Sequence, residues 1–255
     1  MSPSPSLALV LLGGDEEDLA RWSAAAPGAE CQRAPDAAAG YAASTAEVIV
    51  FLDAACLPLP GWQTRWCAAF ADPRRAAAAG RVFPALDPRC EDWARVVQHE
   101  NSGPFGRFDL GHFDREVVFG DRGFLPVDHY AVRRSALDAC GGWPADGAPL
   151  RRLLEAGRGV GYLPGAAVRR PVAADFPLAE RFEVAWREHG RREVRMTAPR
   201  GALARRIAAW RAGRRAARYR RAAAGLEPRS KAWTGICAKA ALHEGRTAEL
   251  RRRPQ

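Results

Sequence analysis

The side chain best placed to do chemistry in this sequence is Asp53, which closes the apolar run Val-Ile-Val-Phe-Leu over residues 48–52. A continuous apolar run of this length, followed by Leu-Pro-Leu-Pro-Gly over 57–61, predicts a central buried strand. In open α/β sheets, ligands bind just beyond the carboxyl ends of such strands. Asp53 therefore stands where a phosphate or a sugar would meet it. The alternative is an aspartate that only caps a turn.

The elements needed to position Asp53 alternate between strand and helix along the first half of the chain. We expect strands over Leu7–Leu12, 29–33, 47–52 and Gly80–Pro84, and helices ending near Ala26 and over Ala37–Thr45 and Trp62–Ala71. Gly13 and Gly14 form the tight turn after the first strand, ahead of the acidic first helical turn 15–18. This alternation predicts an α/β fold with a mostly parallel sheet flanked by helices.

The second half is less regular. Residues 99–123 are rich in Gly, Phe, Asp and His without a period, which predicts a long irregular loop, either an active-site lid or a poorly ordered insertion. Regular structure is expected to resume over Phe124–Val132 and to continue with helices and short strands. The helices are expected over Ser135–Ala139 and Ala148–Ala156, and the strands over Val160–Leu163 and Ala167–Arg170.

Five motifs in a fixed order resemble family 2 glycosyltransferases of the GT-A fold, over about residues 7–175. The motifs are Val-Ile-Val-Phe-Leu-Asp53 with Leu-Pro-Leu-Pro-Gly-Trp62, Ala-Gly-Arg-Val-Phe-Pro84, Tyr-Ala-Val-Arg-Arg-Ser-Ala-Leu137 with Gly-Gly-Trp143, Leu-Arg-Arg-Leu-Leu-Glu-Ala-Gly157, and Tyr-Leu-Pro-Gly-Ala-Ala-Val-Arg-Arg-Pro171. The resemblance implies a GT-A domain over 1–175 that moves a hexose-like sugar from a nucleotide-diphosphate donor to a glycan or lipid-linked acceptor.

The resemblance also implies roles for particular residues. The donor-binding candidates are Asp53, Arg170, Gly13 and Asp36, and the acceptor-binding candidates are Asp128 and His129. Asp146 matches the carboxylate that usually deprotonates the acceptor hydroxyl in this family. That chemistry is reasonable, because a departing diphosphate needs positive charge and an attacking hydroxyl needs a base. The alternatives are a helix-capping role for Asp146 and a structural role for His129.

The metal motif of the family is degraded. Asp-x-Asp is reduced to Asp53-Ala54-Ala55, so the second carboxylate that would hold Mg²⁺ or Mn²⁺ with oxygen ligands is missing. Arg170 stands where the family often has a histidine. No cofactor is certain, and Mg²⁺ or Mn²⁺ stays possible although the motif is degraded. We hypothesise that Arg170, together with Arg169, replaces the metal by bidentate contact with the diphosphate. The alternative is a decayed site in a catalytically inactive homologue that acts as a binding or scaffold protein.

Charge divides the 255-residue chain in two. Residues 179–255 hold 21 of the 39 Lys/Arg and only 7 of the 29 Asp/Glu, so the preceding part is mildly acidic. Six scattered cysteines without a CxxC pair indicate reduced thiols and not a disulfide framework or a zinc site. Ser6–Leu12 is too short for a secretory core, and no stretch reaches the roughly 20 apolar residues that span a bilayer. These features predict a cytoplasmic protein. If it contacts a membrane, we expect it to bind peripherally at the inner face.

The basic extension over 176–255 is expected to be helical, with helices over Phe176–Gly190 and Gly201–Gly225. Leu203, Ile207 and Trp210 stand at i, i+4 and i+7 and form one narrow apolar stripe among arginines. Three partners fit this pattern: an anionic membrane surface, the catalytic domain of the same chain, or nucleic acid. The sequence argues against nucleic acid, because it contains no recognisable binding module and no stacking aromatic residues.

Overall fold

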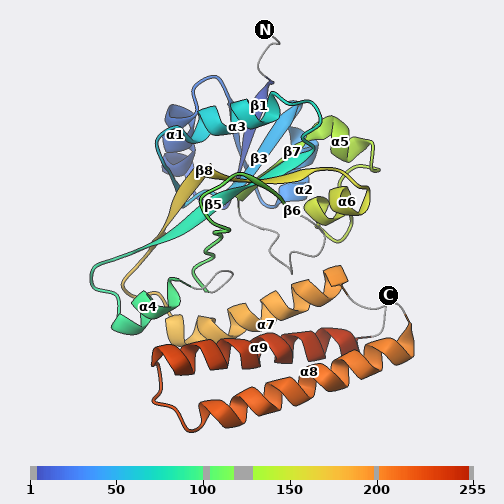
Figure 1. Cartoon of the computed structure of the whole chain (residues 1–255). Coiled ribbons are helices and arrows are strands. Elements are labelled where there is room, and N and C mark those ends of the chain that lie inside the picture. Colours follow the sequence, from blue (N-terminus) through green and yellow to red (C-terminus); the bar gives the residue numbers. More distant parts are fainter. Residues whose placement is uncertain (1–4, 100–103, 118–128, 198–200, 253–255) are drawn as a thin grey trace. The chain divides into compact units, whose positions relative to one another are not determined.

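The computed structural model describes residues 5–99, 104–117, 129–197 and 201–252 (Figure 1). Two compact units make up the chain. The first comprises residues 1–85 and 108–171, and the second comprises 86–107 and 172–255. The boundary expected at 175/176 falls four residues from the observed one, but the second unit also takes in residues 86–107. Asp128 and most of the strand expected over Phe124–Val132 lie outside the described residues.

The described residues of the first unit form a central sheet of eight strands, with the order β2-β1-β3-β7-β5-β8-β4 and with β6 added against β8. The three strands β2, β1 and β3 are parallel, as expected, whereas β7 runs antiparallel to β3 and β5, and β8 runs antiparallel to β4 and β6. The strands are β1 (Leu7–Leu12), β2 (Glu30–Ala34), β3 (Val48–Asp53), β4 (Leu57–Pro58), β5 (Ala77–Leu86), β6 (Arg115–Val117), β7 (His129–Arg133) and β8 (Val160–Val172).

Helices flank this sheet, so the expected α/β class is confirmed (Figure 1). They are α1 (Glu16–Ala25), α2 (Ala37–Ala43), α3 (Trp62–Phe70), α5 (Arg134–Asp138) and α6 (Pro149–Glu155). Asp15 begins α1 with a capping box completed by Asp18. Asp36 begins α2, where its side chain accepts from the Ala39 amide. The apolar faces of these helices and strands share one core, in which all five residues from 48 to 52 are fully buried.

The stretch expected to be an irregular loop over 99–123 is mostly irregular in its described part, but it also contributes one short strand and one isolated bridge to the sheet. Strand β6 pairs with β8, and Phe108 forms an isolated bridge with Val82 of β5. Likewise, the two short strands expected near 160–170 are one strand, β8. Partners distant in sequence supply these hydrogen bonds, and the local sequence carries no period that announces them.

The second unit is a layer of long helices with one short helix. Its helices are α4 (Asp92–Val97), α7 (Leu178–Thr197), α8 (Ala202–Ala223) and α9 (Lys231–Arg251). Its core gathers aromatic rings from three of them, including Trp93, Phe182 and Trp233, and the Trp93 indole donates to the Thr234 hydroxyl at 2.9 Å. Within the described residues, no helix has the length and apolar character needed to cross a bilayer.

Candidate functional site

Three of the predicted donor-binding residues lie at or just beyond the ends of parallel strands, on one edge of the sheet. Leu12, the last residue of β1, pairs with Ala34 of β2 on one side and with Asp53 of β3 on the other. Gly13 and Asp36 follow those strand ends by one and two residues. Because the three strands are parallel, Gly13, Asp36 and Asp53 lie together at the edge where ligands of such sheets bind.

Arg170 reaches Asp53 from the other half of the sheet. Its Nη2 donates to Asp53 Oδ2 at 3.0 Å, across a separation of 117 residues in sequence. The Arg170 side chain is only 16% exposed, whereas the Asp53 side chain is 39% exposed. Arg169, on the same strand, is exposed. The structure therefore joins the predicted carboxylate and the predicted cation in one pair that solvent reaches mainly from the carboxylate side.

Helix α1 holds the turn that carries Asp53 through two hydrogen bonds. The Ala54 carbonyl accepts from Arg21 at 2.8 Å and from the Trp22 indole at 3.1 Å. Gly14 approaches the same turn so closely that a Cβ at this position would come within 2.4 Å of the Ala54 Cβ. Asp53 Oδ1 also accepts from the Ala55 amide at 3.0 Å. These contacts fix the carboxylate before any ligand arrives, and sequence analysis did not anticipate the parts played by Arg21 and Trp22.

The residues at this turn do not fit a divalent metal ion. Ala54 is buried, and Ala55, which stands where the family has its second carboxylate, is exposed and has no donor atom on its side chain. The remaining carboxylate is engaged by the Arg170 guanidinium. In the part of the chain that is described, no three His, Cys, Asp or Glu side chains are grouped so as to hold a metal ion. A hard cation requires several oxygen ligands, which this turn does not supply.

His129 was predicted to contact the acceptor, but the structure places it in the core. Its side chain is fully buried, and Nε2 accepts from the Trp62 indole at 3.0 Å. Burial lowers the pKa of the imidazole to about 3; the Arg81 backbone opposes this shift, and the charge of Arg170 adds to it. His129 is therefore a neutral, buried ring with a structural role, because no acceptor can reach it.

Gly80 makes room for that ring. A Cβ at Gly80 would lie 2.1 Å from His129 Cε1 and 2.5 Å from the Ala166 carbonyl oxygen. Trp62 stacks on the imidazole and Trp66 meets it edge-on. The glycine in the Ala-Gly-Arg-Val-Phe-Pro motif is therefore explained by a close approach between β5 and the histidine of β7.

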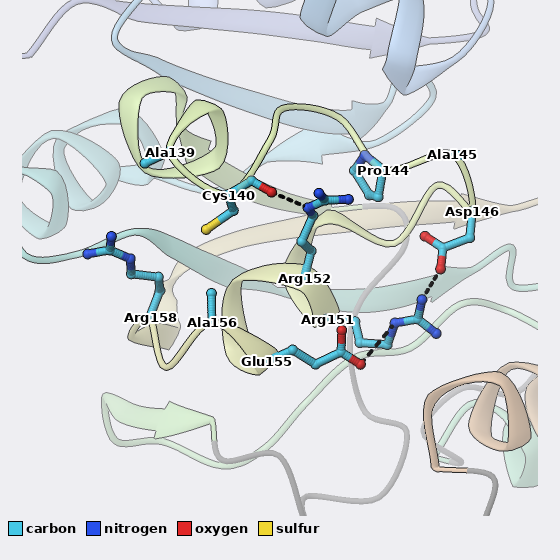
Figure 2. A pocket seen from close by; sticks show the side chains of 10 residues that line it. All are labelled: Ala139, Cys140, Pro144, Ala145, Asp146, Arg151, Arg152, Glu155, Ala156 and Arg158. Atoms are coloured by element: carbon cyan, nitrogen blue, oxygen red, sulfur yellow. Dashed lines mark hydrogen bonds and ion pairs between the residues drawn. The ribbon is translucent and has the colours of Figure 1, made fainter. Parts of the chain in front are cut away.

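Asp146, the predicted base, lines a pocket of about 660 Å³ next to α5 and α6 (Figure 2). Its carboxylate accepts from the Ala148 amide at 3.1 Å and forms an ion pair with Arg151, which also lies near Glu155. Arg152 donates to the Cys140 carbonyl behind it. Neither Asp53 nor Arg170 lines this pocket. The carboxylate thus supports its own turn and faces a cavity rich in arginine.

One aromatic stack connects the Asp146 loop to β3. Trp143, three residues before Asp146, packs on Phe51 with ring centroids 5.3 Å apart and on Tyr41 at 5.4 Å. Phe51 and Asp53 are two residues apart on β3 and so share a face of the sheet. The Gly-Gly-Trp motif therefore holds the loop of the predicted base against the strand that ends in the predicted donor-binding carboxylate.

A buried polar cluster near the site was not anticipated. Arg81 pairs with Asp109 at 2.6 Å, with side chains 12% and 8% exposed, and Tyr162 donates to Asp109 at 3.3 Å. Burial raises the pKa of Tyr162 to about 12. Asp109 lies in the segment predicted to be an irregular loop, and no spacing in the sequence links it to Arg81.

No protein-family model matches this sequence, and no curated protein matches it. Solved structures with a similar chain path include GalNAc-T7 with UDP, GalNAc and Mn²⁺, at 10% identity and a TM-score of 0.44, covering 76% of this chain and 48% of that chain. The chain thus spans about half the length of that glycosyltransferase. A mycobacterial protein is also similar, at 13% identity and a TM-score of 0.44, covering 75% and 74%. Likeness at this level concerns the chain path and transfers no residue role.

Proposed function

We propose that this protein is a GT-A-type glycosyltransferase, nearest in motif order to family 2, that moves a sugar from a nucleotide diphosphate to a glycan or lipid-linked acceptor. The observation that carries this proposal is the Asp53–Arg170 pair at the carboxyl end of β3. A parallel-strand edge is where such sheets bind nucleotides, and a guanidinium supplies positive charge in a form that matches phosphate oxygens.

The chemistry proposed for the site is a single displacement. The acceptor oxygen bonds to the anomeric carbon of the donor sugar, and the bond from that carbon to the diphosphate oxygen breaks with its electron pair. Asp53 orients the Arg170 guanidinium, which balances the charge gathered on the leaving diphosphate, and Gly13 and Asp36 contact the nucleoside. Asp146 does not share a pocket with the Asp53–Arg170 pair, so it can take the proton of the acceptor hydroxyl only if its loop brings the carboxylate to the donor and Arg151 releases it.

The location proposed for the protein is the cytoplasm, at the inner face of the membrane. All six cysteines are free, as in a reducing compartment. A nucleotide-sugar donor would be available there, and a lipid-linked acceptor would lie at the same surface.

The first test measures donor binding. Thermal unfolding of the full chain is followed with a panel of nucleoside diphosphates and nucleotide-sugars, each with and without EDTA. A ligand at 100 times its Kd stabilises the folded state by about 2.7 kcal/mol. We expect at least one ligand to stabilise the wild type in EDTA, Arg170→Gln to abolish the shift, and Arg74→Gln to retain it. Arg74 is a matched control, because its side chain is 89% exposed and, among the described residues, its ion pair is with Asp72, two residues earlier.

The second test separates donor binding from catalysis. Asp146→Asn should leave the thermal shift unchanged and abolish release of the nucleoside diphosphate from the nucleotide-sugar that binds. If no nucleoside diphosphate or nucleotide-sugar stabilises the wild type at millimolar concentration, the proposal fails. A shift that appears only with Mn²⁺ would remove Arg170 from the role given to it here.

A further inference from the structure

Helix α8 carries an exposed apolar stripe on the face opposite its packed face. Leu203, Ile207 and Trp210 are 71%, 43% and 57% exposed. The buried positions of the helix are all alanines: Ala209, Ala212, Ala216 and Ala223. At 100° per residue the two sets lie on opposite sides of the helix. The large apolar side chains therefore point away from α9, against which α8 lies in the second unit (Figure 1).

The same outward face becomes cationic in its second half. Arg214, Arg218 and Arg221 continue the spacing of the stripe, Arg211 flanks it, and Arg215 lies farther round the helix toward His243 of α9; all five are exposed. Helix α8 contains no Asp or Glu. Among the described residues, none of these five arginines is in an ion pair with a carboxylate. Arg214 lies over the Trp210 ring at 5.0 Å and joins the apolar half to the cationic half.

The contrast with the inward arginines of the same helix is informative. Arg220 pairs with Glu183 and Glu244, and Arg205 donates to carbonyls at the end of α9. Those two side chains stabilise the helical unit. The outward arginines form no ion pair with a carboxylate of the described residues, and their charges face solvent next to three large apolar side chains.

We propose that this face of α8, defined by Leu203, Ile207, Trp210 and the outward arginines, binds an anionic lipid surface. A basic helix with a tryptophan on its apolar stripe lies in the plane of a membrane interface, with the apolar side chains inserted and the cations at the headgroups. Nucleic acid would use the arginines but not the stripe, because apolar side chains add nothing to phosphate neutralisation. This proposal does not depend on sugar transfer.

The experiment is co-sedimentation of the full chain with vesicles of phosphatidylcholine alone or with about 30% phosphatidylglycerol, at low and high salt. We expect binding to the anionic vesicles only, weakened by salt. The variant L203S/I207S/W210S should bind at least about tenfold more weakly, as should R214Q/R215Q/R218Q/R221Q. Both sets of positions are exposed, so the far-ultraviolet circular dichroism should be unchanged. Lys239→Gln, an exposed cation on α9, should bind like the wild type.

Three results would overturn the proposal. The first is vesicle binding that the apolar triple variant leaves unchanged, or no vesicle binding at all. The second is binding to duplex DNA, at equal phosphate concentration, that is as tight as binding to anionic vesicles. The third is a concentration-dependent dimer in gel filtration that the triple variant abolishes, because a second copy of the chain would then cover the stripe.

Discussion

Two glycines of helix α9 should respond in opposite directions to the same substitution. A Cβ at Gly245 would lie 1.9 Å from the Arg187 carbonyl oxygen and 2.7 Å from its carbon, both backbone atoms of α7. A Cβ at Gly235 would have no heavy atom within 4 Å. Both residues lie in the interior of one helix, so the gain in helix propensity from alanine is the same for both, about 1 kcal/mol.

The magnitude follows from the geometry. Cβ contacts shorter than 3.0 Å are essentially never observed, so Gly245→Ala forces α7 and α9 apart by roughly an ångström, because backbone atoms cannot rotate away as a side chain would. Overpacking of this kind costs about 1–3 kcal/mol, and we expect the upper end of that range. Gly235→Ala should therefore stabilise the protein by about 1 kcal/mol. Gly245→Ala should destabilise it by about 1–2 kcal/mol after the propensity gain is subtracted.

The assay is urea unfolding of the full chain, followed by circular dichroism at 222 nm, for the wild type and both variants. The difference in free energy of unfolding between the two variants isolates the clash, because the propensity gain cancels. If Gly245→Ala proves as stable as Gly235→Ala, the close approach of α7 and α9 at this glycine is refuted, and with it the packing described for the helical unit.

Two further predictions concern pH and an ionic network. The pKa of His129 is about 3 in the folded protein and 6.5 ordinarily, so between these pH values the unfolded chain binds a proton that the folded protein does not. Lowering the pH from 7 to 5 should therefore reduce the free energy of unfolding by about 2 kcal/mol. Urea unfolding at the two pH values should show this loss in the wild type and not in His129→Gln. Arg220 lowers the pKa of Glu183 and of Glu244 below the ordinary 4.5 by hydrogen bonding, so the stability it adds is present above pH 4.5 and lost below it. Arg220→Gln should destabilise the protein by about 1–2 kcal/mol at pH 7 and by less at pH 3.5, whereas Arg218→Gln on the same helix should change stability by less than about 0.5 kcal/mol.

Features encoded in short stretches of sequence were predicted well. The run ending in Asp53 is a buried strand, the three N-terminal strands are parallel, and a helix starts at Ala37. Apolar periodicity and capping residues act over a few positions, so their effect can be read without knowing the rest of the chain. Gly13, Asp36 and Asp53 were donor-binding candidates from the family resemblance; the structure places them at or just after the ends of parallel strands on one edge of the sheet, and their donor-binding role stays a prediction.

Features that depend on distant partners were not predicted, or were predicted wrongly. His129 could not be distinguished from a surface histidine until Trp62 and Gly80 were placed around it. Strand β6 and the Arg81–Asp109 pair lie in a stretch with no local period, and their partners are contributed by other strands.

The sequence by itself identified the charged residues that are candidates for the site at the end of β3. It also showed that a basic helical segment follows the α/β unit. Only the tertiary structure decided that Arg170 meets Asp53 and that the Leu203–Trp210 stripe faces away from α9. The physical reason is range: a helix or strand forms from contacts between near neighbours, whereas an ion pair across 117 residues, or the choice of which helix face is buried, depends on how every other element packs.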